Sequence, residues 1–265
     1  KFSKVSLFSG LNNLRDITLE ARWSALCGYT DADIDTVFAP ELPGLDRAQI
    51  RRWYNGYNWG GTSVYNPFDV LLLFQNRQFQ PYWFETGTPT FLVRLLTERG
   101  FHTPDLSRLH GSLTLLSRFD VDRIEPEALL FQAGYLTLHG VTEPLPGQQV
   151  YTLGYPNREV EASLNAALLY GHGVPERPSF DTRIRLVEVL RQGDTAALRE
   201  LFHAFFASIP NDWYRNNPIA RFEGYWASIF YSHFAALGLD IVVEDATNRG
   251  RIDMTVLFAG AVWLF

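Results

Sequence analysis

Apolar residues recur every three or four positions from residue 218 to residue 237, and this spacing predicts an amphipathic helix. Pro218 suits its first turn, because the backbone N–H that proline lacks has no intrahelical partner there. Gly238 can end the helix. Glu223 falls on the apolar row, so the pattern directs its carboxylate toward the core, where an unpaired charge is costly. Glu223 therefore needs a metal ion, a cation or a proton as its partner.

A strict alternation of apolar and polar residues follows this helix and predicts a β-hairpin. Residues 240–244 form its first strand, a polar turn covers 245–250, and residues 251–258 form its second strand. Asp253 is expected on the face opposite the apolar residues of its strand, because successive side chains of a strand point to opposite faces. A third, apolar strand is expected over 261–265.

The rest of the chain predicts mainly helices. Thr30 precedes one helical pattern and can accept hydrogen bonds from its first free N–H groups. Pro89 is expected in the first turn of another helix, with Thr86 or Thr88 as its cap. Residues 172–178 contain glycine and proline and are expected to form a linker. The other predicted elements are strands over 16–19, 135–139 and 150–155 and helices over 46–54, 70–74, 125–133, 158–169, 182–192 and 195–208.

The composition indicates a soluble globular protein and excludes several classes. The 265 residues are 46% hydrophobic, which is enough for a sizeable core. No apolar run reaches the roughly 18 residues that span a bilayer, and the start of the chain lacks a signal peptide. The single Cys27 rules out an intramolecular disulfide, so we expect a cytoplasmic protein without membrane contact. A net charge of −6 gives no global basic field for coating nucleic acid.

The helix with Glu223, the Gly-Arg-Ile-Asp sequence that ends at Asp253, and the apolar third strand together resemble the core of the PD-(D/E)XK nucleases. The resemblance implies that Glu223 and Asp253 are catalytic residues that bind a metal ion, Mg²⁺ or Mn²⁺. Oxygen ligands suit Mg²⁺, which activates water and offsets the charge of the phosphate. In that family a Glu-x-Lys follows on the third strand, and we expect it just beyond Phe265. Judged from the residues alone, a capped or salt-bridged pair near Arg251 is the alternative.

Two further sequences, Trp-Tyr-Asn-Gly-Tyr from Trp53 and Tyr-Asn-Pro-Phe from Tyr65, resemble bacterial AAA-ATPase-like proteins that carry such a nuclease behind the ATPase part. The same resemblance places Lys1-Phe-Ser-Lys just after the sensor strand of the ATPase. The P-loop that binds ATP is then expected upstream, since these residues contain no G-x-x-x-x-G-K-[ST].

The resemblance also assigns residues near the nucleotide. Asn12 and Asn13 would lie on the γ-phosphate side of the ATP site, and Gly87 with Pro89 would begin a lid helix against the adenine. The residues themselves leave two alternatives open. The asparagines can cap the next helix, and Gly87 and Pro89 can mark an ordinary helix start.

The predicted fold is mixed α and α/β, in four parts. Residues 1–111 are expected to be the C-terminal part of an AAA-ATPase-like domain with its helical lid, residues 112–170 a winged-helix-like module, residues 171–216 a helical connector, and residues 217–265 a truncated restriction-endonuclease-like α/β core. The hairpin loop of the second part carries no lysine or arginine, whereas non-specific affinity for DNA comes mostly from neutralising phosphates. We therefore expect that part to be a structural lid.

For the full-length protein, the resemblance implies ATP binding coupled to metal-dependent cleavage of nucleic acid, DNA rather than RNA. The alternative is a regulatory or defence-type switch ATPase whose nuclease-like unit is an inactive binding module. A Glu-x-Lys after Phe265 favours the first function, and its absence favours the second. The present residues alone are expected to be a scaffold without activity, and a homo-oligomer is compatible with the sequence.

Overall fold

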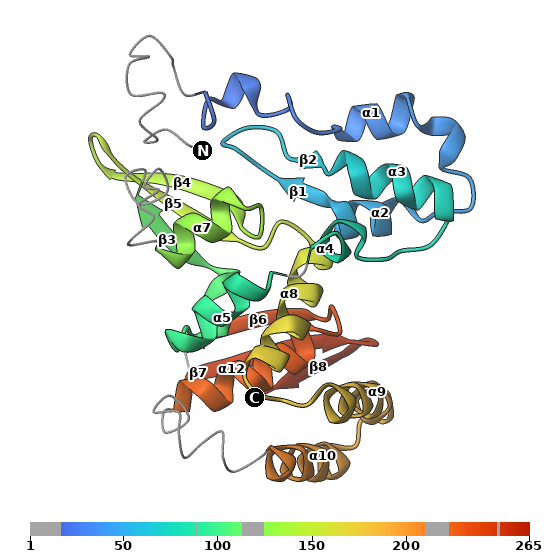
Figure 1. Ribbon diagram of the computed structural model, residues 1–265, viewed down its shortest axis with the longest axis vertical. Helices are drawn as coiled ribbons and strands as arrows, with labels where there is room; N and C mark the ends of the chain where they lie inside the picture. The colour runs from blue at the N-terminus through green and yellow to red at the C-terminus, as the bar shows by residue number, and fades with distance from the viewer. Residues whose placement is uncertain (1–16, 88, 113–124, 210–222, 248–249) are drawn as a thin grey trace. The chain divides into compact units, whose positions relative to one another are not determined.

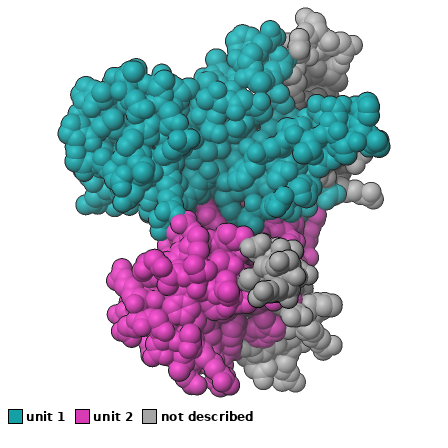
Figure 2. Space-filling model, turned by 180° about the vertical axis from the view of Figure 1, so that it is seen from behind, with its two compact units in different colours: residues 1–88, 106–160 teal, residues 89–105, 161–265 magenta. Residues whose placement is uncertain are grey.

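The computed structural model describes residues 17–87, 89–112, 125–209, 223–247 and 250–265 (Figure 1). Helices predominate in this part of the chain, and its strands form small antiparallel sheets. The chain divides into two compact units: unit 1 contains residues 1–88 and 106–160, and unit 2 contains residues 89–105 and 161–265 (Figure 2). Within the described ranges, every helix is too short or too polar to span a lipid bilayer.

Unit 1 begins with short helices whose starts are fixed by polar side chains. Thr30 accepts a hydrogen bond from the backbone N–H of Asp33 at 3.2 Å, and the Asp33 carboxylate accepts one from the N–H of Thr30 at 2.7 Å. This is a capping box, so the predicted helix start at Thr30 is confirmed. The elements are η1 Ala21–Trp23, α1 Asp31–Thr36, η2 Ala39–Glu41, α2 Arg47–Tyr54, β1 Asn55–Tyr57, β2 Val64–Tyr65, α3 Pro67–Asn76 and α4 Tyr82–Glu85.

A compact apolar core joins α1, α2, α3 and the β1–β2 pair. The strands pair antiparallel with an irregularity at Gly56, where the backbone has a φ of 125°. Asp46 caps α2, and Asn66 caps α3 directly before Pro67. The predicted helix over 70–74 is therefore part of a longer one. The buried members of the core are Ile34, Ile50, Tyr54, Tyr65, Val70, Leu73, Phe74 and Tyr82.

The second sheet of unit 1 has the strand order β3-β5-β4 and is antiparallel. Helix α7 (Pro126–Gln132) precedes β4 (Thr137–Leu145) and β5 (Gln148–Gly154), which confirms the predicted helix and both strands. Strand β3 (Leu109–Ser112) was not predicted. It pairs with β5 from Leu109 opposite Leu153 to Ser112 opposite Val150, so its backbone pairing rather than its side-chain pattern defines it.

Three local predictions are wrong. Residues 17–20, within the predicted strand and directly after it, form a turn. Pro89 lies at the N-cap of α5 (Thr90–Glu98) rather than in its first turn, and α5 has no side-chain cap. The Thr86 hydroxyl donates instead to the carbonyl of Trp83, while Thr88 lies outside the described residues.

The helices of unit 2 also correct the predicted linker over 172–178. Helix α9 (Glu176–Gln192) begins inside that stretch, with Pro175 at its N-cap. Pro178 is the third residue of α9, where the N–H that proline lacks has no intrahelical partner. Proline therefore marks the start of this helix rather than a linker. The other helices with residues in unit 2 are α5, η3 Thr103–Ser107, α8 Arg158–Gly171, α10 Thr195–Ser208 and α12 Glu223–Ala235. The last residues of η3 and the first residues of α8 are assigned to unit 1.

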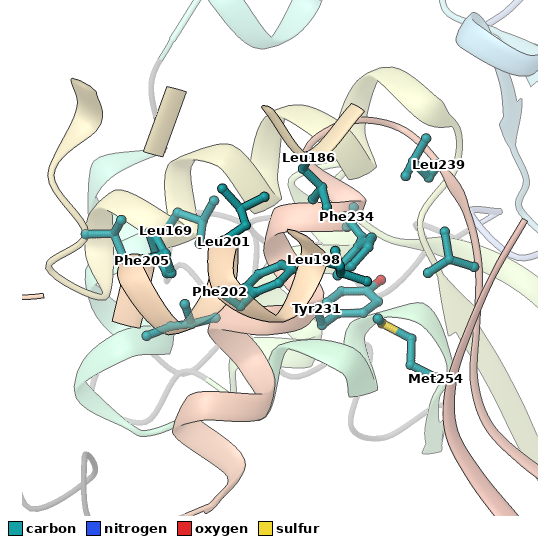
Figure 3. Close-up of a cluster of buried hydrophobic side chains, with 14 of the residues drawn as sticks. Leu169, Leu186, Leu198, Leu201, Phe202, Phe205, Tyr231, Phe234, Leu239 and Met254 are labelled. Atoms are coloured by element: carbon teal, nitrogen blue, oxygen red, sulfur yellow. The ribbon is translucent and has the colours of Figure 1, made fainter. Parts of the chain in front are cut away.

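Helix α12 is buried on most of its surface, which differs from the amphipathic helix predicted. Phe234 stacks on Phe202 of α10 with ring centroids 5.6 Å apart, and Figure 3 shows them in one apolar cluster. Ser228, Ser232 and His233 are buried too, because neighbouring segments pack against the side on which a polar face was expected. The core of unit 2 includes Leu169, Leu186, Leu190, Leu198, Leu201, Phe202, Phe205, Ile229, Tyr231, Phe234, Leu239, Met254 and Val256.

The sheet of unit 2 confirms the predicted hairpin and third strand. Strands β6 (Asp240–Thr247), β7 (Gly250–Phe258) and β8 (Ala261–Leu264) are antiparallel and follow one another in sequence order. Met254 and Val256 of β7 are buried in the core shared with α12. Alternate residues expose the other face of the sheet, where Val242, Leu257, Val262 and Leu264 are between 44% and 62% exposed. That apolar face is open in the described part of the chain.

Candidate metal-binding cleft in unit 2

A cleft of about 630 Å³ lies in unit 2 between α12, the adjoining edge of the sheet and the segment after α5. Its floor is apolar, and Asp253 contributes a carboxylate to it. The lining residues are His102, Pro104, Phe206, Gly224, Trp226, Ala227, Phe230, Tyr231, Val243, Asp253, Met254 and Phe265.

Asp253 reaches the cleft from an irregular point of β7. The backbone N–H groups of Asp253 and Met254 both donate to the carbonyl of Phe265, at 3.0 and 3.2 Å. These bonds join β7 to the residue that follows β8. The exposed Asp253 lines the cleft together with the buried Met254 that follows it.

The start of α12 lies at the same cleft. Glu223 is the first residue of α12, and its side chain lies outside the part of the structure that is described. Gly224, which follows it directly, lines the cleft with Asp253. The backbone therefore brings the positions of Glu223 and Asp253 to one place, whereas the predicted contact between their carboxylates stays a prediction.

Aromatic side chains build the wall of the cleft opposite the strands. The rings of Phe206 and Trp226 meet edge to face at 5.4 Å, and those of Phe230 and Phe265 at 5.2 Å. At the rim, Nδ1 of His102 and Oδ1 of Asp105 lie 3.1 Å apart. Trp226 and Phe230 belong to the apolar spacing that predicted this helix. Spacing alone does not distinguish a core residue from a cleft wall.

Hydrogen bonds of buried polar side chains fix α12 in place behind the cleft. The Ser228 hydroxyl accepts from the N–H of Thr103 at 3.0 Å and donates to the carbonyl of Gly224 at 2.7 Å. Ser232 and Asn165 of α8 are joined by a 3.0 Å bond. These bonds cross from α12 to η3 and to α8, so the helix start beside Asp253 is held from two sides.

The described residues fit a divalent cation only in part. An Asp carboxylate in an open cleft is the oxygen ligand that Mg²⁺ prefers. The residues that the structure describes contain no group of three or more histidine, cysteine, aspartate and glutamate side chains placed to hold a metal ion. They thus supply one carboxylate, and further ligands have to come from Glu223 or from residues outside the described ranges.

Of the residues predicted near the nucleotide, the two that the structure describes do not line this cleft. Asn12 and Asn13 lie outside the described residues. Gly87 is exposed after α4 in unit 1, and Pro89 precedes α5 in unit 2. The lining of the cleft includes neither of them, and their assignment to ATP stays a prediction.

Comparison with known proteins supports a nuclease-like C-terminal part. Residues 221–265 match the family described as the PD-(D/E)XK nuclease superfamily. The whole chain is 65% identical over 266 residues to a protein of Azotobacter chroococcum mcd 1 named "Uncharacterized protein in vnfD 5'region". The chain spans 51% of the length of that relative. No solved structure matches the chain.

Proposed function

We propose that the full-length protein is a metal-dependent nuclease of the PD-(D/E)XK type that cleaves DNA. The observation that carries the proposal is the agreement between the family match over residues 221–265 and the cleft that Asp253 lines beside the start of α12. In this proposal Glu223 and Asp253 bind Mg²⁺ or Mn²⁺. The ion would activate water and offset the charge that develops on the phosphate.

The proposal includes an ATP-binding part of the AAA-ATPase-like kind. Its support is the sequence around Trp53 and Tyr65, which forms the end of α2, the β1–β2 pair and the start of α3 in unit 1. ATP would be bound mainly by a P-loop outside these residues, with Asn12, Asn13, Gly87 and Pro89 near it. Coupling would appear as a change of cleavage rate on addition of ATP.

The test is cleavage of plasmid and single-stranded DNA by the full-length gene product with Mg²⁺ or Mn²⁺, with and without ATP. Replacing Asp253 by asparagine keeps the shape of the side chain and removes its charge. Because a catalytic metal contributes several kcal/mol to the transition state, we expect the cleavage rate to fall by about a hundredfold or more. Glu223→Gln should have a similar effect.

Asp240→Asn is the matched control, because Asp240 is an exposed aspartate on β6 that does not line the cleft. It should leave cleavage unchanged. Full activity of Asp253→Asn would exclude this site. A wild-type protein that cleaves nothing but hydrolyses ATP would instead favour the switch ATPase with an inactive nuclease-like module.

A further inference from the structure

Unit 1 buries two carboxyl groups beside each other. Asp69 of α3 and Glu159 in the first turn of α8 are both 0% exposed. Neither forms a salt bridge with a described residue. A buried charge without a partner is strongly unfavourable, so the surroundings of this pair have to account for its charge.

Backbone amides at the start of α4 bind one oxygen of each group. The N–H of Trp83 donates to Oδ1 of Asp69 at 2.8 Å, and the N–H of Phe84 donates to Oε1 of Glu159 at 3.0 Å. The second oxygens, Oδ2 of Asp69 and Oε2 of Glu159, have no donor among the described residues. Because Trp83 and Phe84 are consecutive residues, their amides hold the two carboxyl groups close together. Two carboxylates cannot bond each other, since each only accepts.

The pair has uncharged polar neighbours. Tyr57 of β1 and Asn157 before α8 are buried, and Tyr57 lies within hydrogen-bonding reach of the side chains of Asn157 and Asn66. The pKa of Tyr57 is raised, first by burial and then by the negative charge of Glu159 and Asp69. Tyr54 of α2 is a further titratable group near the pair, and the negative charge of Glu159 and Asp69 also raises its pKa. A tyrosine is uncharged at neutral pH, so none of them balances a carboxylate.

We propose that Asp69 and Glu159 form a buried proton-binding site, in which the carboxyl group of Glu159 keeps its proton and donates a hydrogen bond to the Asp69 carboxylate. One proton supplies the donor that the two free oxygens lack. It also leaves a single negative charge, and that charge receives hydrogen bonds from the amides of α4.

Electrostatics supports the same assignment. Burial raises the pKa of Glu159, and the negative charge of Asp69 raises it further. Burial also raises the pKa of Asp69, against which the hydrogen bonds from Glu159 and Trp83 act. The shift is larger for Glu159, which is therefore the group that holds the proton. Two charged groups so close in a low-dielectric interior would repel each other strongly.

A divalent cation fits the pair less well than a proton. Mg²⁺ and Ca²⁺ require about six or more oxygen ligands, whereas two of the four carboxylate oxygens already accept backbone N–H groups. The proton instead links Asp69 of α3 to Glu159 in the first turn of α8. Both carboxyl groups also accept hydrogen bonds from backbone amides of α4. Loss of the proton would place a second negative charge in the first turn of α8.

The stability of unit 1 should then fall as the pH rises. The pKa of Glu159 is higher in the folded state than in the unfolded state. At any pH between these two pKa values, the folded state therefore binds more protons than the unfolded state. This contribution is complete in acid and is lost progressively above the ordinary pKa range of glutamate. Glu159→Gln replaces the protonated carboxyl by an uncharged amide that can still donate to Asp69.

The experiment combines infrared spectroscopy with thermal unfolding of the whole chain. Wild type should keep the carbonyl band of a protonated carboxylic acid at pH 7.5, and Glu159→Gln should lose it. Between pH 5 and pH 9, the melting temperature of wild type should fall by about 5 °C more than that of Glu159→Gln. Glu85→Gln, on the exposed side of α4, is the matched control and should behave as wild type in both measurements.

Two results would overturn the proposal. One is a wild-type infrared spectrum at pH 7.5 without the carbonyl band of a protonated carboxylic acid, because both acids would then be ionised. The other is a rise of the wild-type melting temperature with Mg²⁺ or Ca²⁺ at pH 8 that Glu159→Gln lacks, since the pair would then bind a cation. The infrared measurement on wild type holds even if the variant is poorly folded.

Discussion

Replacing Gly56 by alanine is expected to destabilise the protein by about 4 kcal/mol, a large part of the stability of a typical domain. Two causes act together at this position. The backbone of Gly56 has a φ of 125°, which residues with a side chain rarely adopt. In addition, an added Cβ would overlap the backbone carbonyl of Pro156. Neither the carbonyl nor the strand can move without displacing β1 or the start of α8.

Gly147→Ala is the matched control for this prediction. Gly147 also has a positive φ, 79°, yet nothing lies within 4 Å of the position of an added Cβ. Gly147→Ala should therefore lower the free energy of unfolding by only about 1 kcal/mol, the penalty of the backbone conformation. Chemical denaturation gives the two free energies of unfolding, and hydrogen exchange should show the loss of protection in β1, β5 and the start of α8. Equal effects of the two substitutions would show that the approach of Pro156 is not restrictive.

The close approach of Pro156 to Gly56 also explains the glycine of the Trp-Tyr-Asn-Gly-Tyr motif, whose role the sequence alone does not show. In the sequence, Trp-Tyr-Asn-Gly-Tyr carries the resemblance to AAA-ATPase-like proteins, and a glycine beside asparagine by itself indicates a turn. The structure places Gly56 in a short strand beside Pro156, a hundred residues further along the chain. No local pattern carries that information, because the need for glycine arises from the backbone of another segment.

Elements with a strong side-chain period were predictable. The hairpin of β6 and β7 and the helix α10 follow from alternation and from three-to-four spacing, and both agree with the structure. Strand β3 has neither signal: it is short, contains a glycine and exists because β5 offers it backbone partners. The buried polar residues of α12, such as Ser228 and Ser232, show the opposite limit, since each is buried only because its hydrogen-bond partner lies on another element.

The candidate site in unit 2 was predictable only in part, because it also depends on contacts between different elements. Asp253 could be placed on the polar face of its strand, but its place in one cleft with Gly224 depends on how α12 packs against the sheet. The acid pair of unit 1 was missed altogether. Asp69 stands beside Val70 in an otherwise apolar helix, and Glu159 precedes Val160, so both positions carried a weak signal of burial. Their proximity is a property of the tertiary structure alone.

Unit 2 is expected to lose stability in acid because it buries two neutral histidines. His172 and His233 are 4% and 0% exposed, and burial lowers the pKa of each from 6.5 to about 4. The positive charge of Arg183 acts in the same direction on His233. Below pH 6.5 the unfolded state therefore binds more protons than the folded state, and stability falls as the pH falls toward 4. The loss at pH 5 is about 2 kcal/mol for each histidine.

His233→Phe should remove one of these contributions. The ring of His233 packs against Phe205 at 4.2 Å and Phe202 at 6.0 Å, so phenylalanine keeps an aromatic ring there and loses only the bond from Nδ1 to the carbonyl of Ile229. His203→Phe, on the exposed side of α10, is the control. Hydrogen exchange of α12 at pH 5 and pH 7 should show a smaller difference in His233→Phe than in either wild type or His203→Phe. An unchanged difference would mean that His233 does not take up its proton on unfolding. The acid pair of unit 1 responds to pH in the opposite sense. The hydrogen-exchange protection of α3 and of the start of α8 should therefore not fall between pH 7 and pH 5.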